Sequence, residues 1–496
     1  MFTTTLIVLI INVLSRGMAL VANSFITASF GATAQTSAYS FALTLTNIIT
    51  TVIGTTLTTS VVPIYTDLRE KHSKKRTFDF LNNTISLTVI VSIVLVLIGS
   101  LAAPLFAKMA KDGDYGFTIY AIRILLYSII FIALYYILSG LLQANNRFYL
   151  AAAVSIPSSL VSIIYLTAFA PKFGMKGLCV ATLIGFFLQF FILVPAIRKI
   201  DYRFSLSFNY KNEDMFKIFK VVAPVIVGVC AHQINLLTNG SIAFSHDANR
   251  YVVLNNAQNL GVQIVMTIVL AITSVVYPKM STLHAKGDLK GLNEQFLSTL
   301  SGSVLLLLPV NFAFYIYSYD IMDLVYGYGK FTASDVALGG TVFSLYSFSV
   351  LGIAFKEITD RAFYALKNTK TPAYNGVLIM AVNIILSAVT VKFWGLAGIA
   401  FAYSVAALCG GINIFRLFKK KNAGILVKPV ATAFLKSVTG CVIMSIVIIL
   451  VKNIGFGDGK LALILKMGIS GILGLIAYGV TLILLKTKEI KSIIKF

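Results

Sequence analysis

Arg16 lies inside a long apolar segment, in the string INVLSRGMALVANSF over residues 11–25, and that segment contains no acidic residue. A guanidinium in hydrocarbon costs about 3 kcal/mol or more, so this position requires a reason. Asn12 and Asn23 stand four residues before and seven residues after Arg16, which places all three on one face of a helix. These residue types offer hydrogen bonds and one positive charge. No nucleophile elbow, metal-ligand pair or carboxylate dyad accompanies them, so the pattern favours binding over catalysis.

Similar polar stripes occur at helical spacing in three other apolar segments. They contain Ser37, Ser40, Thr44, Asn47, Thr51, Thr55 and Thr58; then His232, Asn235 and Asn239; then Asn256, Asn259, Gln263 and Thr267. A polar face on a membrane helix must meet water or other helices rather than lipid. We predict that the four faces line a shared hydrated cavity. The alternative is that they join helices by packing and hydrogen bonds.

One cluster of opposite charges interrupts a later apolar segment, at Lys356, Glu357, Asp360 and Arg361. Lys356 and Asp360 are four residues apart on one helix face, which predicts an internal ion pair. Carboxylates within a membrane also carry protons or cations in coupled transporters. Glu357 and Asp360 are therefore candidates for ion coupling as well.

The chain that positions these residues is built from long apolar segments. Hydrophobic residues make up 58% of its 496 residues and charged residues only 12%, about half the share usual in soluble proteins. We predict an all-α polytopic membrane protein with about 14 transmembrane helices, since runs of about 20 apolar residues recur throughout. The predicted helices cover residues 3–28, 37–66, 82–107, 117–143, 148–170, 175–198, 215–240, 250–278, 293–318, 337–365, 372–392, 394–417, 428–451 and 460–486.

The net charge of +23 would suggest a nucleic-acid partner in a soluble protein. Here most basic residues lie in the C-terminal tail and in the loops that follow even-numbered helices, as at 74–76 and 419–421. Cytoplasmic loops of membrane proteins collect Lys and Arg. The pattern predicts an even number of spans, both termini in the cytoplasm and no nucleic-acid partner.

Two pairs of strings show that the chain repeats itself. TSVVPIYTDL (59–68) resembles TSVVYPKMSTL (273–283), and KFGMKGLCVATLIGFFLQFFILVPAIRK (172–199) resembles KFWGLAGIAFAYSVAALCGGINIFRLFKK (392–420). Each pair is separated by six helices, so the partners run in the same direction. Two parallel six-helix lobes are predicted, with a substrate site between them.

The repeat predicts four regions. They are an N-lobe of helices 1–6 over residues 1–198, a cytoplasmic linker over 199–217, a C-lobe of helices 7–12 over 218–421, and helices 13 and 14 with a basic cytoplasmic tail over 422–496. The sequence contains no P-loop for ATP. Transport would therefore draw on an ion gradient, the membrane potential or the substrate itself, without a cofactor.

Several strings carry a resemblance that covers nearly the whole chain. They are SFGATAQTSAYSFALTLTN after the first helix, SGLLQANNRF (139–148), DRAFYALKNTKTP (360–372) and GLAGIAFAYSVAA (395–407). With fourteen predicted helices, the chain resembles the MurJ/MviN family of lipid II flippases. This family belongs to the superfamily of multidrug, oligosaccharidyl-lipid and polysaccharide exporters.

The resemblance implies transfer of an undecaprenyl-pyrophosphate-linked muropeptide across the bacterial cytoplasmic membrane by alternating access. Arginines of the first two helices and of the eighth face the cavity in this family, where they suit an anionic pyrophosphate. Arg16 matches the first of them. Other charged positions of the family fall on uncharged residues here, at Ala22, Asn23, Ser37, Thr50, Thr51, Asn239 and Asn259.

The residue patterns and the resemblance together give two sets of candidate residues. The substrate-binding candidates are Arg16, Asn12, Asn23, Ser37, Asn47, Thr51, Asn259 and Gln263. The candidates for coupling to Na⁺, H⁺ or the membrane potential are Asn239, Asn383, Glu357 and Asp360. No catalytic residue and no metal site are expected.

Three functions remain open on the sequence. The first is a flippase for a lipid-linked glycan, with lipid II as the default and another lipid-linked oligosaccharide as a variant. The second is a cation-coupled exporter of small amphiphiles. The third is a membrane scaffold that no longer transports.

Overall fold

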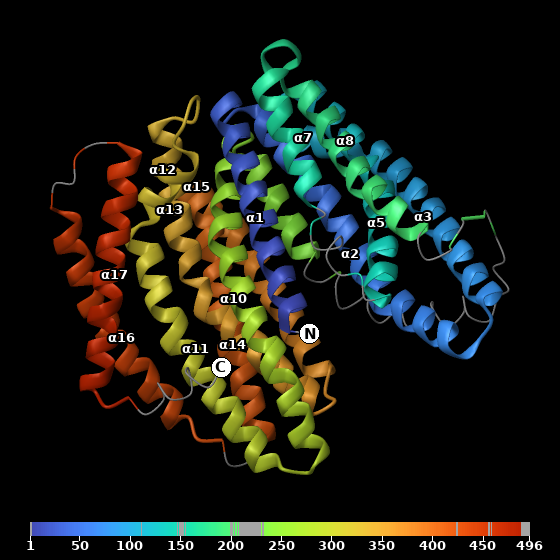
Figure 1. Cartoon of the computed structure of the whole chain (residues 1–496). Coiled ribbons are helices and arrows are strands. Elements are labelled where there is room, and N and C mark those ends of the chain that lie inside the picture. Colours follow the sequence, from blue (N-terminus) through green and yellow to red (C-terminus); the bar gives the residue numbers. More distant parts are fainter. Residues whose placement is uncertain are drawn as a thin grey trace. The chain divides into compact units, whose positions relative to one another are not determined.

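The computed structural model describes residues 2–110, 112–145, 147, 153, 155–198, 202, 204–205, 207, 230, 233–422, 425–454, 457 and 459–487. Helices make up nearly all of this part of the chain, and it contains no strand (Figure 1). Most of the predicted linker over 199–217, all but residues 202, 204–205 and 207, falls outside the described residues, as does most of the predicted helix over 215–240. The C-terminal tail beyond residue 487 does so as well.

Contacts between residues divide the chain into two compact units, Met1–Val252 with Tyr328–Phe331, and Val253–Gly327 with Thr332–Phe496. The first unit holds α1 (Phe2–Phe30), α2 (Ala34–Lys71), α3 (Lys74–Met109), α4 (Tyr115–Leu126), α5 (Ser128–Ala144), α7 (Ser155–Ala168), α8 (Ala170–Arg198) and a helix over 233–246. The second holds nearly all of α10 (Tyr251–Ala285), then α11 (Leu289–Ile316), α12 (Ser318–Tyr326), α13 (Ala333–Ser347), α14 (Ser349–Ala365), α15 (Lys370–Lys421), α16 (Lys428–Lys452) and α17 (Lys460–Leu484). The lobe boundaries inferred from the repeat stay a prediction.

Eleven helical stretches of the described chain are long and apolar enough to cross a membrane. One of them, the 52-residue α15, is broken at Gly395 and accounts for two predicted helices. The apolar α7 is shorter, with 14 residues. The predicted all-α polytopic membrane fold is confirmed.

The structure differs from the predicted helices in two ways. The predicted helices over 117–143 and 337–365 are each interrupted, at Tyr127 between α4 and α5 and at Phe348 between α13 and α14. Both residues keep a right-handed conformation, so the apolar pattern runs on through the break. The amphipathic α12 was not predicted, because its nine residues are too few to span a membrane.

The internal repeat is visible in the backbone. Gly174 and Gly395 occupy equivalent places in the repeated strings, and both have a positive φ, of 58° and 54°. This positive-φ conformation is essentially restricted to glycine and costs other residues about 1–3 kcal/mol. In each unit the glycine allows two helices to follow one another with a kink and no loop. The interruptions at Tyr127 and Phe348 also lie at equivalent positions of the internal repeat.

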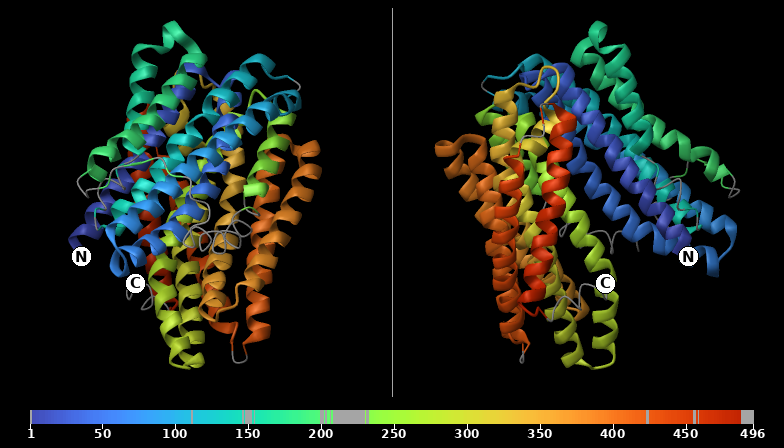
Figure 2. Two further views of the ribbon diagram at one scale, coloured as in Figure 1. Left: turned by 90° about the vertical axis from the view of Figure 1, so that its right-hand side faces the viewer. Right: turned by 60° about the vertical axis from the view of Figure 1, so that its left-hand side comes forward.

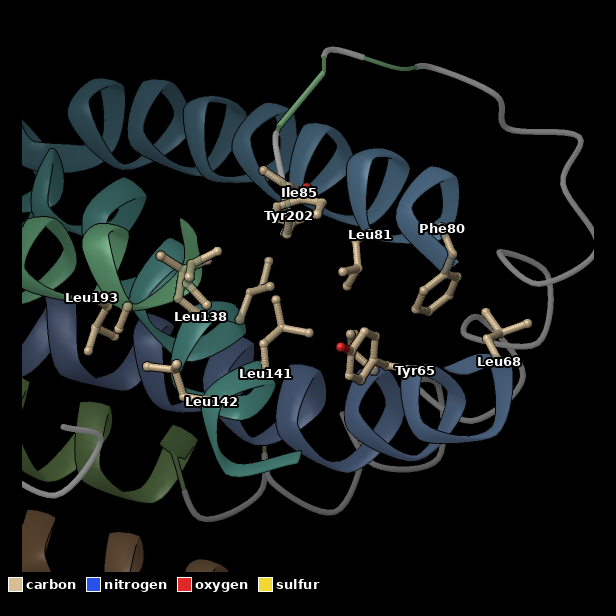
Figure 3. Close-up of a cluster of buried hydrophobic side chains, with 14 residues drawn as sticks. Tyr65, Leu68, Phe80, Leu81, Ile85, Leu138, Leu141, Leu142, Leu193 and Tyr202 are labelled. Atoms are coloured by element: carbon tan, nitrogen blue, oxygen red, sulfur yellow. The ribbon is translucent and has the colours of Figure 1, made fainter. Parts of the chain in front are cut away.

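The core of the first unit joins α2, α3, α5 and α8. Tyr65, Phe80, Leu138 and Leu193 are buried together there, and Figure 3 shows the cluster. A buried hydrogen bond of 2.8 Å between the hydroxyls of Tyr39 and Thr182 also ties α2 to α8. These contacts fix α2, whose polar stripe is central to the candidate site.

The core of the second unit is rich in phenylalanine. Phe418 of α15 packs against Phe296 of α11 and Phe363 of α14, with ring centroids 4.5 and 5.0 Å apart. The last two helices, α16 and α17, lie side by side (Figure 2). Ion pairs from α12 reach both of them, through Asp320 with Lys452 and Asp323 with Lys460.

Candidate functional site

The polar face of α1 changes from exposed to buried along the helix. Arg16 is exposed and Asn23 is half-buried. Thr27 is buried, and its Oγ1 donates to the carbonyl oxygens of Asn23 and Ser24 at 3.2 and 3.1 Å. The side chain of Asn12 lies outside the described residues. Of the predicted binding residues on α1, Arg16 and Asn23 therefore keep side chains that a ligand can reach.

The stripe on α2 also begins buried. Ser37 is fully buried, donates from Oγ to the carbonyl oxygen of Asn249 at 2.8 Å, and accepts from the backbone N–H of Val252 at 3.1 Å. It thereby holds the start of α10 against α2. Its predicted role in binding substrate is untested, but its hydrogen bonds give it a structural role.

Further along α2 the stripe reaches the surface. Thr44 Oγ1 and the Tyr251 hydroxyl are 3.2 Å apart, and Phe41 stacks on Phe244 with ring centroids 4.5 Å apart. One helical turn beyond Thr44, Asn47 is exposed, and Thr51 is half-buried.

The stripe on α10 in the second unit also carries exposed polar groups. Asn259 is half-buried and donates from Nδ2 to Asn255 Oδ1 at 3.0 Å. Gln263, one turn later, is exposed, and its carbonyl oxygen accepts from Thr267 Oγ1 at 2.8 Å. The predicted spacing thus yields a polar face with an exposed amide.

Exposed polar groups in the middle of apolar helices restrict what these faces meet. Hydrocarbon supplies no hydrogen bonds, so an exposed guanidinium or amide facing lipid is strongly unfavourable. Arg16, Asn47 and Gln263 therefore require water, protein or a polar ligand next to them in the membrane.

The two candidate coupling asparagines are buried. Asn239, on the helix over 233–246, is 6% exposed and its Oδ1 lacks a hydrogen-bond partner. Asn383 on α15 is fully buried, and its Oδ1 accepts from Ser387 Oγ at 3.2 Å. A buried amide oxygen without a donor is available to a cation. Among the described residues, no group of three or more His, Cys, Asp or Glu side chains is placed to hold a metal ion.

The predicted ion pair on α14 is confirmed. Lys356 Nζ lies 2.9 Å from Asp360 Oδ2 and 2.8 Å from Glu357 Oε1. Arg361 lies 3.9 Å from the second oxygen of Glu357. Two cations thus balance two carboxylates within one and a half turns. This arrangement occupies both carboxylates with protein cations and leaves less of their charge available to a transported ion.

Comparison with known proteins places the chain in a family. The sequence profile described as "Lipid II flippase MurJ" matches residues 26–467. The chain belongs to the MurJ family. A probable lipid II flippase MurJ of Bdellovibrio bacteriovorus is 26% identical over 477 residues, which cover 90% of this chain and 87% of that protein. Another, of Buchnera aphidicola subsp. Schizaphis graminum, is 23% identical and covers 83% and 81%.

Solved structures show the same fold. A lipid II flippase MurJ in an inward closed conformation superposes with a TM-score of 0.80 at 22% identity, covering 96% of this chain and 98% of that chain. An inward-facing multidrug resistance MATE family transporter of the MOP superfamily gives a TM-score of 0.70 at 15% identity, covering 85% and 98%. The chain is thus a multi-pass membrane protein of this fold, and the names of its relatives describe transport rather than catalysis.

Sequence reasoning missed the contacts that attach α12 and the segment after α8. Asp320 and Asp323 stand three residues apart on α12 and each pairs with a lysine of α16 or α17. Tyr202, just after α8, is buried against α3. The spacing of the two acidic residues in SYDIMDLVY was the available signal for the ion pairs of α12. The sequence carries no comparable signal for the contact of Tyr202 with α3.

We expect the polar face of α2 to be hydrated in the membrane. In a variant whose four native cysteines are replaced by serine, Asn47→Cys should react with a small aqueous maleimide. Thr46→Cys should not react, because Thr46 is fully buried. Leu97→Cys should also stay unreactive: Leu97 is 59% exposed, but on an apolar face of α3 that lipid would cover. Equal labelling of Asn47→Cys and Leu97→Cys, or no labelling of either, would contradict a hydrated face.

The charge cluster on α14 should contribute to stability. Lys356→Met leaves the Glu357 and Asp360 side chains, 13% and 6% exposed, without their shared cation. We expect the free energy of unfolding to fall by about 3 kcal/mol. Lys71→Met is the matched control, since the Lys71–Asp67 pair has the same i,i+4 spacing but is 69% and 51% exposed, and its loss should cost less than about 1 kcal/mol. Thermal unfolding in detergent measures both, and equal losses would refute the assignment.

Proposed function

We propose that this member of the MurJ family moves lipid II, an undecaprenyl-pyrophosphate-linked muropeptide, from the inner to the outer leaflet for peptidoglycan synthesis. The family match over residues 26–467 carries the proposal. Transport proceeds by alternating access and involves no bond making or breaking by the protein. The chain acts in the bacterial cytoplasmic membrane with both termini in the cytoplasm, as its distribution of basic residues favours.

Arg16 is the proposed contact for the pyrophosphate. It is exposed in the middle of α1, and a guanidinium binds phosphate oxygens through paired, charge-assisted hydrogen bonds. Asn23, Asn47 and Thr51 on α1 and α2, and Asn259 and Gln263 on α10, are further candidates for binding the substrate. Amides and hydroxyls suit the sugar and peptide part of the substrate, because they donate and accept hydrogen bonds without requiring a counter-charge.

A cation gradient or the membrane potential supplies the free energy in this proposal. Asn239 is the favoured coupling residue, since its Oδ1 is buried and lacks a donor. Glu357 and Asp360 are less suitable, because Lys356 already engages both. This argues against a multidrug-type exporter coupled through carboxylates.

A flippase for another lipid-linked oligosaccharide is the second candidate. It is favoured by the uncharged residues at positions where the family carries charge, such as Ala22, Thr50 and Thr51. Such a protein would keep the pyrophosphate contact and change the glycan it accepts. The same experiment separates the two candidates.

Expression of this chain should rescue a bacterium depleted of its own lipid II flippase. Arg16→Ala should abolish rescue, and Arg16→Lys should retain part of it because the charge remains. Loss of a charge-assisted hydrogen bond of about 1.5–3 kcal/mol corresponds to roughly a 10- to 150-fold loss of affinity. Arg123→Ala is the control, since the Arg123 Nε donates to the Ser100 carbonyl oxygen at 3.3 Å, within the protein.

Membrane levels of each variant are measured by immunoblotting. Failure of the unaltered chain to rescue, at normal membrane levels, would reject lipid II as the substrate and leave other lipid-linked glycans. Full rescue by Arg16→Ala would reduce Arg16 to a structural residue.

A further inference from the structure

An apolar cavity of about 860 Å³ lies within the first unit. Ligand sites usually enclose about 300–1,000 Å³. Its walls come from α3, α5 and α8, including Ile85, Leu138 and Val194, and it is completed by Arg198, Tyr202 and Phe204. Seven of its ten lining residues are aliphatic or phenylalanine residues on these three helices, and none is acidic. None of its lining residues lies on α1 or α2, the helices of this unit that carry polar stripes.

Tyr202 and Phe204, which follow α8 in the sequence, form part of the cavity wall, and hydrogen bonds hold Tyr202 and Ser205 against α3. The Tyr202 hydroxyl donates to Asn82 Oδ1 of α3 at 2.7 Å, and the Ser205 N–H donates to the same oxygen at 3.1 Å. The Tyr202 ring packs edge-on against Phe78, with centroids 5.3 Å apart. Burial raises the pKa of the Tyr202 phenol, so the hydroxyl stays neutral and keeps its proton for Asn82. Figure 3 shows Tyr202 beside Ile85, with Leu138 on the neighbouring α5.

The lining of the cavity indicates an amphiphile with a negative head. The walls are apolar, whereas Arg198 brings a charge and is exposed. The string RKIDYR over 198–203 holds three basic residues and one acid. The cavity also adjoins apolar surfaces of its own helices. Ile90 follows the lining residue Val89 and is 41% exposed, and Phe191 follows the lining residue Phe190 and is 51% exposed.

The position of the cavity along the helices indicates the leaflet. It lies near the end of the unit where α3 begins with Lys74, Lys75 and Arg76 and where α8 ends with Arg198. Basic helix ends face the cytoplasm. Anionic phospholipids are enriched at cytoplasmic membrane surfaces and attract juxtamembrane Lys and Arg.

We propose that this cavity binds one acyl chain of an anionic phospholipid from the cytoplasmic leaflet, with its phosphate at Arg198. The bound lipid packs against Tyr202 and Phe204 and stabilises the attachment of the segment after α8 to α3. The site is independent of the transported substrate. A failure of lipid II transport would leave this proposal intact, and the reverse also holds.

Photo-crosslinking of the purified full chain in phosphatidylcholine nanodiscs tests the site. The probe is phosphatidylglycerol with a diazirine on one acyl chain, and labelled peptides are identified by mass spectrometry. We expect labelling of α5 around Leu134 and Leu138, because Leu134 is half-buried and Leu138 is 6% exposed. Lipid at the outer surface would not reach the buried Leu138. Unlabelled phosphatidylglycerol should compete, and phosphatidylcholine should not.

Two matched pairs of variants separate the cavity from the surrounding surface. Val194→Trp fills the cavity and should cut the α5 label at least about fivefold, whereas Ile192→Trp, at a 44% exposed position of the same helix, should not. Arg198→Gln should cut the label about fivefold, the equivalent of about 1 kcal/mol. Lys75→Gln removes an exposed charge on α3 and should leave the label unchanged. Thermal unfolding checks that each variant is folded.

Three results would overturn the proposal. The first is an α5 label no stronger than that from a phosphatidylcholine probe. The second is a label that persists in folded Val194→Trp. The third is displacement by undecaprenyl phosphate but not by phosphatidylglycerol, which would make the cavity a site for the polyprenyl chain.

Discussion

Hydrocarbon offers no hydrogen bonds, so every polar side chain on a membrane helix must be satisfied by protein, water or a ligand. Many hydroxyls in this chain are satisfied by their own helix. Thr46 and Thr58 of α2 donate to the carbonyl oxygens of Ala42 and Gly54 at 2.9 and 2.8 Å. An exposed guanidinium or carboxamide in the middle of a helix needs hydrogen-bond partners from other parts of the protein, from water or from a ligand. This distinction separates polar residues that serve packing from those that belong to a transport path.

The two units differ in the surroundings of the charged side chains on their apolar helices. On α14 they are neutralised locally, by two cations and two carboxylates within a few residues. On α1 the apolar segment around Arg16 contains no acid. A neutralised cluster is stable whatever binds nearby, whereas the exposed Arg16 guanidinium is accessible to an anionic ligand. The pyrophosphate of a lipid-linked glycan matches that requirement in charge and in geometry.

Long apolar runs and repeated strings allowed most of the fold to be predicted, because length and periodicity are local properties of the chain. Even the equivalence of Gly174 and Gly395 follows from the repeat. The short α12 was missed because it is too short to span a membrane. The breaks at Tyr127 and Phe348 were missed because they do not change the apolar pattern.

For the candidate site, spacing places residues on a face and cannot tell what that face meets. Ser37 and Asn47 belong to one stripe, yet the first is fully buried in a structural hydrogen-bond pair and the second is exposed. The contact of Tyr202 with Asn82 joins residues 120 positions apart, so no local sequence pattern predicts it. Burial and distant contacts depend on tertiary packing, which the sequence pattern leaves open.

We infer that this member of the MurJ family, with few charges on its polar faces, still carries lipid II across the membrane. The most direct test is reconstitution of the purified chain in proteoliposomes that contain fluorescent lipid II, with the label made accessible to a quencher only in the outer leaflet. The account predicts faster exchange of lipid II between leaflets than in protein-free vesicles, and no acceleration for a fluorescent phospholipid. Equal rates with and without the protein, under an imposed ion gradient and membrane potential, would contradict it.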